Sequence, residues 1–365
     1  MNICIIGDSL TTLALAKNLI NKKIKVFLYY KYKKKPSLKS RTIGISKNNL
    51  NFFNKEIVKF KKDTIWNIKK IEIYNEKLEN EKILNFEKSD KQLFSIIKND
   101  EIYKLLDDDL KKNKLFKKIF IKNNKFYEKI LNDKKYELII NCDSNNQISK
   151  NFFYKKIKKN YYSYAYTTII KHQKVNNIKA VQKFTKKGPI AFLPVSNFKT
   201  SVVFANNSER IILNQDQIKN LIIKYNTEYK IKNFTEIEKF KLNFSLHRNY
   251  YYKNVMAFGD GLHTIHPFAG QGFNMILRDI KILSQIIQDR INLGLMLDHS
   301  IYEDFEKKTK HLNFIFSSGI DFIYEFFNFD NKYKNIYLSK LLKFIGKKNF
   351  FNKIATNYAD KGLHI

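Results

Sequence analysis

Residues 259–279 read GDGLHTIHPFAGQGFNMILRD. This stretch contains four of the eleven glycines of the chain, at positions 259, 261, 270 and 272, and two of its seven histidines. The run KNVMAFGD (253–260) predicts a buried strand that presents Asp260 at its carboxyl end, where open α/β sheets bind ligands. The stretch therefore predicts a ligand site that needs exposed main chain.

The residues after Asp260 predict how such a ligand is held. Pro267 stiffens a loop, and Gly270 and Gly272 lack the Cβ that would keep a ligand away from the backbone. An amphipathic helix over 273–290 begins directly after them, so its N–H groups and partial positive charge would face the ligand. A flat heterocycle that gains negative charge on reduction suits this arrangement. The alternative is an ordinary glycine loop that caps a core helix.

A second feature typical of nucleotide binding lies at the start of the chain. NICIIGD (2–8) and IKVFLYY (24–30) read as strands, and LTTLALAKNLIN (10–21) reads as a helix between them. A strand, tight turn, helix and strand within about 30 residues form a βαβ unit. The turn before the helix is where such folds bind phosphate, because the amino terminus of the helix offers unpaired N–H groups.

The remaining pattern predicts two kinds of sheet. YELIINCD (136–143) reads as a buried strand, WNIKKIEIYN (66–75) and KILNFE (82–87) as a β-hairpin, and 160–245 as short antiparallel strands. The predicted fold class is α/β: a Rossmann-like domain interleaved with a mostly antiparallel β-sheet domain, plus C-terminal helices. We place the Rossmann-like domain at 1–63, 90–150 and 253–299, the sheet domain at 64–89 and 151–252, and the helical region at 300–365.

The formal net charge of +34 suggests nucleic acid at first sight. The lysines are, however, scattered over the whole length, as expected when an AT-rich genome encodes positions where function is indifferent. We therefore expect a solvated surface and no specific binding of nucleic acid. Arg41 is one of only five arginines, which indicates a planar, bidentate contact that lysine cannot replace.

Cysteine and histidine usage is typical of a reduced, metal-free protein. Cys4 and Cys142 lie in apolar runs and predict buried thiols in a cytoplasmic protein. No Cys/His spacing predicts a metal site, and we expect neither a signal peptide nor a membrane-spanning helix. His263 and His266 lie i, i+3 in a loop, and hydrogen bonding within that loop is the favoured role over metal binding or general base catalysis.

Five segments together resemble a known family. GDGLHTIHPFAGQGFNMILRD is similar to the GDAAHxxHPxxGQGxNxGxxD signature of the flavin monooxygenases with the para-hydroxybenzoate hydroxylase fold. Four more segments resemble motifs of the ubiquinone-biosynthesis hydroxylases and occur in family order. They are RTIGIS (41–46), INCDS (140–144), AVQKFTKKGPIAFLPVSN (180–197) and LDHSIYEDFEKKTK (297–310).

The resemblance implies roles for individual residues toward FAD. Asp260 would bind the ribityl chain, and Arg41 the flavin or pyrophosphate region. Gly7 would begin the phosphate turn, and Asp143 would lie near the adenosine and pyrophosphate. The pyrimidine edge of the isoalloxazine ring would lie against Gly270, Gln271, Gly272 and Phe273, with Pro267 in the preceding loop and Asn274 nearby.

The chain departs from the family pattern at the dinucleotide end. The family's GxGxxG reads GDSLTT (7–12), so Ser9 and Thr12 replace glycines; their hydroxyls could donate to phosphate, but their side chains obstruct close approach. Asp8 adds a negative charge near the expected pyrophosphate, and the ribose-binding acid at the end of the second strand is Tyr30. These departures keep open a flavin-poor, catalytically silent subunit of a quinone-biosynthesis complex.

The implied activity is that of an FAD-dependent monooxygenase, an enzyme that uses NAD(P)H as a transient reductant and O2. The resemblance implies hydroxylation of the aromatic ring of a polyprenylphenol-type ubiquinone precursor through a flavin C4a-hydroperoxide, with no side chain identified as catalytic. It also allows membership in a quinone-biosynthesis complex and peripheral contact with the inner face of the membrane. A flavin reductase of the same fold that saturates isoprenoid double bonds is a further alternative.

Overall fold

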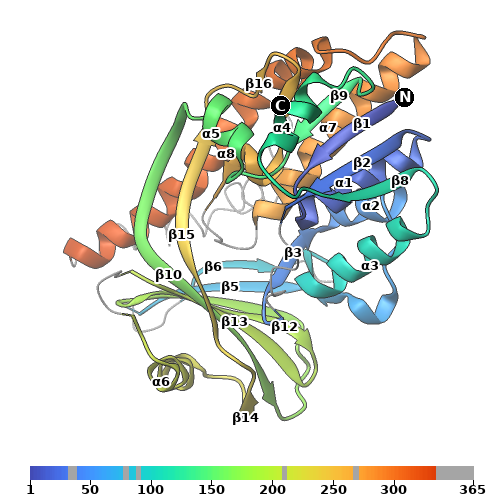
Figure 1. Ribbon diagram of the computed structural model, residues 1–365. Helices are drawn as coiled ribbons and strands as arrows, with labels where there is room; N and C mark the ends of the chain where they lie inside the picture. The colour runs from blue at the N-terminus through green and yellow to red at the C-terminus, as the bar shows by residue number, and fades with distance from the viewer. Residues whose placement is uncertain (32–38, 77–81, 88–91, 208–211, 266–270, 334–365) are drawn as a thin grey trace.

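The computed structural model describes residues 1–31, 39–76, 82–87, 92–207, 212–265 and 271–333. It contains a six-stranded sheet, a nine-stranded sheet and a three-stranded sheet (Figure 1). The helices are α1 (Leu10–Asn21), α2 (Lys47–Glu56), α3 (Asn99–Lys111), α4 (Lys125–Asn132), α5 (Gln147–Phe152), α6 (Gln215–Tyr225), α7 (Gln271–Asn292) and α8 (Ser300–Tyr333), with 3-10 turns η1 (Lys62–Thr64) and η3 (Gly259–Gly261). The mixed parallel and antiparallel sheets confirm the predicted α/β class.

The six-stranded sheet is parallel except at one edge. In spatial order its strands are β16 (Tyr251–Tyr252), β17 (Val255–Ala257), β9 (Leu138–Asn141), β1 (Asn2–Ile6), β2 (Lys25–Tyr30) and β8 (Phe116–Phe120), with only the β16–β17 pair antiparallel. The predicted βαβ unit is therefore β1–α1–β2, with Ile6 opposite Tyr29. The central strands β1 and β9 bury continuous apolar runs, as expected for parallel strands covered on both faces.

The nine-stranded sheet is mostly antiparallel, as predicted for 160–245. In spatial order its strands are β18 (His263–Thr264), β15 (Glu238–His247), β10 (Lys156–His172), β13 (Lys199–Asn206), β12 (Gly188–Ser196), β11 (Lys179–Thr185), β5 (Lys70–Asn75) and β6 (Lys82–Glu87), and β14 (Ile231–Phe234) also pairs with β10. Helix α6 packs Ile218 and Ile222 into the apolar cluster on one face of this sheet. The long strands β10 and β15 run side by side toward α5 (Figure 1).

The three-stranded sheet corrects one sequence prediction. It comprises β3 (Thr42–Ser46), β7 (Phe94–Lys98) and β4 (Trp66–Ile68), all antiparallel. The predicted single strand over 66–75 is divided: Trp66–Ile68 pairs with β7, whereas Lys70–Asn75 forms the predicted hairpin with β6. The switch occurs at Lys69, whose N–H donates to Ile178 O at 2.9 Å and transfers the chain to the edge of β11.

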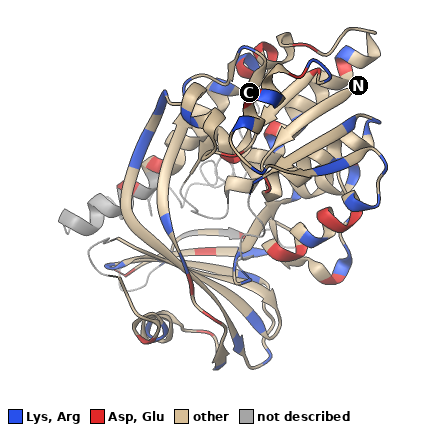
Figure 2. Ribbon diagram, viewed as in Figure 1, with Lys and Arg blue, Asp and Glu red and all other residues tan. Residues whose placement is uncertain are grey.

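Lys and Arg are distributed over all the sheets and most helices (Figure 2). No helix within the described ranges is long and apolar enough to cross a membrane. Cys4 and Cys142 are buried free thiols, as predicted, and desolvation raises the pKa of both.

Candidate functional site

The turn after β1 is shaped by Gly7. Its φ of +132° is a conformation that side chains disfavour, and its N–H donates to Tyr29 O at 2.8 Å. A Cβ on Gly7 would lie 3.2 Å from Thr12 Oγ1 and 3.5 Å from Asp143 N. The one glycine of the family's three that the chain retains therefore makes the turn that leads from β1 into α1.

Ser9 and Thr12 form a capping box at the start of α1. Ser9 Oγ accepts from Thr12 N at 3.4 Å, Thr12 Oγ1 accepts from Ser9 N at 3.2 Å, and the two hydroxyl oxygens lie 3.0 Å apart. The S-x-x-T spacing resembles a capping box, a signal that the sequence analysis did not use. The side chains thus satisfy two main-chain donors themselves, and the N–H groups of Leu10 and Thr11 remain without an intrahelical acceptor.

Asp260 projects at the carboxyl end of β17, where the sequence predicted it. The residue is exposed in η3, and its Oδ2 accepts a hydrogen bond from Thr11 Oγ1 at 3.2 Å. The neighbouring glycines allow close packing there. A Cβ on Gly259 would lie 2.2 Å from Thr11 Cγ2, and one on Gly261 would lie 2.7 Å from Asn141 O. The arrangement brings a carboxylate and the first turn of α1 together.

The start of α7 is anchored by a buried side chain next to the half-buried Gly272. Among the described residues, the nearest atom to a Cβ on Gly272 would be Ile265 Cγ1 at 3.8 Å, an ordinary contact distance. Phe273 is buried against Phe53. Pro267, Gly270 and His266 lie outside the described residues, as does the side chain of Gln271.

Asn274 joins α7 to β3 and α2. Its Nδ2 donates to Gly44 O at 2.8 Å, and its Oδ1 accepts from Ser46 N at 3.0 Å and from Asn49 Nδ2 at 3.0 Å. The side chain is buried in these contacts. Asn274 therefore positions the start of α7 against the RTIGIS segment, a role that the sequence analysis did not identify.

Arg41 and Asp143 lie on different elements near this region. Arg41 is exposed, with its guanidinium carbon 5.7 Å from the centre of the Phe240 ring. Asp143 follows β9, and its Oδ1 accepts from Asn145 N at 2.9 Å. The main-chain nitrogen of Asp143 lies close to Gly7, in the turn before α1. Arg41 instead contacts Phe240 of the nine-stranded sheet, so of these two residues only Asp143 lies at the α1 turn.

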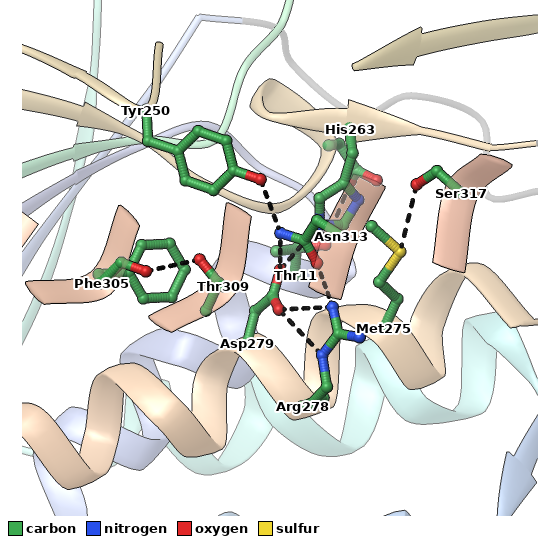
Figure 3. Close-up of polar contacts among 11 residues, drawn as sticks. Thr11, Tyr250, His263, Met275, Arg278, Asp279, Phe305, Thr309, Asn313 and Ser317 are labelled. Atoms are coloured by element: carbon green, nitrogen blue, oxygen red, sulfur yellow. Dashed lines mark hydrogen bonds and ion pairs between the residues drawn. The ribbon is translucent and has the colours of Figure 1, made fainter. Parts of the chain in front are cut away.

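His263 makes a buried hydrogen bond, but its partner lies on α7 and not within the loop, where the sequence analysis expected it. Its Nε2 donates to Asp279 Oδ2 at 2.9 Å, and both side chains are buried. Asp279 also accepts from Arg278 at 3.0 Å and from Asn313 Nδ2 at 3.3 Å (Figure 3). Burial alone would raise the pKa of Asp279, but Arg278 and His263 lower it. Within the described residues, no group of three His, Cys, Asp or Glu side chains is placed to hold a metal.

Asp8 has partners that the sequence did not indicate. Its Oδ1 accepts from Tyr103 Oη at 2.7 Å and from Lys118 Nζ at 3.0 Å. Lys118 also bonds Asp107 and lies 5.1 Å from the centre of the Tyr30 ring. The charge that the sequence analysis placed beside the pyrophosphate is therefore paired.

Two linked sheets with a nucleotide-type βαβ unit form the fold that solved FAD-dependent monooxygenases share. The solved structure of p-nitrophenol 4-monooxygenase PnpA from Pseudomonas putida DLL-E4 has a TM-score of 0.78 at 9% identity, and the alignment covers 100% of this chain and 98% of that one. A variant of HpxO from Klebsiella pneumoniae, complexed with FAD, has a TM-score of 0.71 at 11% identity, with coverage of 98% and 99%.

The curated relatives are ubiquinone-biosynthesis hydroxylases, which confirms the resemblance. The 3-demethoxyubiquinol 3-hydroxylase of Escherichia coli K12 is 29% identical over 154 residues, 40% of this chain and 39% of that protein. The ubiquinone biosynthesis monooxygenase COQ6 of Dictyostelium discoideum is 27% identical over 183 residues, 40% of this chain and 37% of that protein. The matches thus span about two fifths of these relatives' lengths. No family model matches the chain.

Proposed function

We propose that the chain is an FAD-dependent monooxygenase that hydroxylates the aromatic ring of a polyprenylphenol-type precursor in ubiquinone biosynthesis, with NAD(P)H and O2. The observation that carries the proposal is the exposed Asp260 beside the first turn of α1, in a segment that matches the family signature. The names of the curated relatives support the pathway and the reaction class.

The described residues fit FAD. The exposed carboxylate of Asp260 can accept hydrogen bonds from ribityl hydroxyls, and a Cβ on Gly272 would meet no described atom closer than 3.8 Å. Main-chain N–H groups at the start of α1 remain available to an anion. When bound, FAD supplies the redox chemistry with oxygen, so the chain needs no nucleophile of its own.

The chain's own residues would bind and orient FAD and stabilise charge on its ring. Asp260 would hold the ribityl chain, while the α7 amino terminus, held by Asn274 against β3, would direct its partial positive charge toward the ring. Such a fixed field would stabilise negative charge on the ring. We place the small hydrophobic substrate between this ring and the nine-stranded sheet. Contact with a membrane surface or with a quinone-biosynthesis complex is part of the same proposal.

Flavin binding tests the proposal directly. The purified protein should be yellow or become so with FAD, and Asp260→Ala should raise the Kd of FAD by about tenfold to hundredfold, because a charge-assisted hydrogen bond is lost. Asp63→Ala, which removes an exposed carboxylate on η1, should leave the Kd unchanged. Consumption of O2 and NAD(P)H with a prenylated phenol, together with gain of one oxygen atom by the phenol, tests the reaction.

The alternative, a flavin-poor subunit without catalytic activity, is favoured by one observation. The Ser9–Thr12 capping box places side chains where the family has glycines at the phosphate turn. A protein that remains colourless in excess FAD, with a cooperative unfolding transition, would establish this alternative and exclude the monooxygenase.

A further inference from the structure

The acid that nucleotide-binding folds use to bind ribose is absent from its usual strand. That acid stands at the end of the second strand, where its carboxylate accepts hydrogen bonds from ribose hydroxyls. Here β2 ends at Tyr30. A carboxylate is present nearby, however, at Asp8 in the turn between β1 and α1.

The contacts of Asp8 show that it faces the β2 side of the sheet. Lys118, which donates to Asp8 at 3.0 Å, lies on β8 next to β2 and over the Tyr30 ring. Tyr103, which donates at 2.7 Å, lies on α3. The same turn is joined to β2 by the Gly7 N–H bond to Tyr29 O at 2.8 Å. Asp8 therefore stands beside the end of β2, close to the position of the missing acid.

One oxygen of the Asp8 carboxylate can still accept a hydrogen bond from a ligand. Both bonds from Tyr103 and Lys118 reach Oδ1, and no bond within the described residues reaches Oδ2 of Asp8. Burial and the hydrogen bond to Asp8 raise the pKa of Tyr103, so its hydroxyl remains a donor. Lys118 balances the charge of Asp8 and is itself shared with Asp107. The carboxylate is thus held in place and electrostatically balanced while Oδ2 can accept.

We propose that Asp8 binds the adenosine ribose of FAD through Oδ2, in place of the acid missing from β2, with Tyr103 and Lys118 as positioning residues. This inference rests on the proposed function. If the charge of Asp8 only repelled the nearby pyrophosphate, removal of the carboxylate would strengthen FAD binding, whereas the ribose contact predicts that removal weakens it.

The test compares FAD with its analogue whose adenosine ribose lacks both hydroxyls, using quenching of flavin fluorescence. The wild type should bind FAD about tenfold more tightly than the analogue, the value of one charge-assisted hydrogen bond. Asp8→Asn should raise the Kd of FAD about tenfold and abolish this discrimination. Unfolding midpoints identify a variant that fails to fold. If Asp8→Asn binds FAD as tightly as the wild type or more tightly, the ribose assignment is overturned.

A second pair of variants tests the positioning role of Lys118. Lys118→Met should raise the Kd of FAD severalfold in the wild type but have little effect in the Asp8→Asn background, because the two residues act through one contact. Lys117→Met, at the exposed neighbouring position on β8, is the matched control and should leave the Kd of FAD unchanged in both the wild-type and the Asp8→Asn backgrounds. Equal effects of Lys118→Met in both backgrounds would overturn the positioning role. A wild type that binds no flavin would overturn the proposed function as well.

Discussion

At the scale of single residues, two glycines of one motif have different roles. A Cβ on Gly261 would lie 2.7 Å from Asn141 O, which is backbone and cannot move aside, whereas a Cβ on Gly272 would reach only ordinary contact at 3.8 Å. We expect Gly261→Ala to lower the free energy of unfolding by about 1–3 kcal/mol, and Gly272→Ala to change it by less than about 1 kcal/mol. Urea denaturation of both variants measures the difference, and equal losses would contradict it.

His247 predicts a pH dependence of stability. Its side chain is buried on β15, its Nδ1 has no hydrogen-bond partner within the described residues, and desolvation with nearby Lys156 lowers its pKa from 6.5 to about 4. Between pH 6.5 and about 4 the unfolded chain binds the proton more readily, so stability falls as the solution becomes more acidic.

From pH 7.5 to pH 5 this histidine alone should cost about 2 kcal/mol of unfolding free energy. His247→Leu should remove that part of the loss. Urea titrations of both proteins at the two pH values measure it. A wild type and variant that lose the same amount between pH 7.5 and pH 5 would show that His247 charges as easily in the folded state as in the unfolded one.

At the scale of elements, the side chain of Asn274 joins the amino terminus of α7 to its neighbours. Asn274 bonds Gly44 O, Ser46 N and Asn49 Nδ2 at 2.8 to 3.0 Å, and so connects α7 with β3 and α2. Asn274→Ala should lower the free energy of unfolding by about 2–4 kcal/mol, because buried main-chain groups at Gly44 and Ser46 lose their partner. It should also weaken FAD binding through misplacement of the helix.

Asn145→Ala, in the turn after β9, is a suitable control for Asn274→Ala. Asn313→Ala is not, because Asn313 belongs to a second buried hydrogen-bond network. Denaturation and flavin titration should both show a loss for Asn274→Ala and little for Asn145→Ala. An Asn274→Ala protein as stable as the wild type would mean that packing of Phe273, and not this side chain, holds the helix.

How far the sequence predicted these elements depends on the range of the interactions. The strands predicted at 2–8, 24–30 and 136–143, the βαβ unit and the helix over 273–290 follow from local periodicity, and the structure has β1, β2, β9 and α7 there. The division of 66–75 between two sheets was not predicted, because it depends on a long-range hydrogen bond from Lys69 N–H to Ile178 O. The partners of Asp8, Tyr103 and Lys118, are likewise 95 and 110 residues away, beyond any local pattern. The assigned domain boundaries and cofactor residues remain predictions.

At the scale of the whole molecule, the two large sheets and the helices α7 and α8 are joined by one buried hydrogen-bond network. His263 belongs to β18 of the nine-stranded sheet, Asp279 to α7 and Asn313 to α8. Asn313 Nδ2 also donates at 3.1 Å to the hydroxyl of Tyr250, which precedes β16 of the parallel sheet (Figure 3). The GDGLH segment thus connects the sheets through its histidine as well as presenting Asp260.

Two Arg–Asp pairs, one within α7 and one between α7 and α8, predict how much of the stability depends on this network. Arg278–Asp279 and Arg290–Asp304 have the same 3.0 Å separation, but the carboxylate is 0% exposed in the first pair and 40% exposed in the second. Asp279→Ala should cost about 3–5 kcal/mol, because it removes the partner of the buried His263 Nε2 and the carboxylate that balances the charge of Arg278. Asp304→Ala should cost about 0–1 kcal/mol, because water screens the exposed pair. Urea denaturation of both variants measures the loss of unfolding free energy. Equal losses in Asp279→Ala and Asp304→Ala would mean that apolar packing, and not the buried hydrogen-bond network, holds the two sheets together.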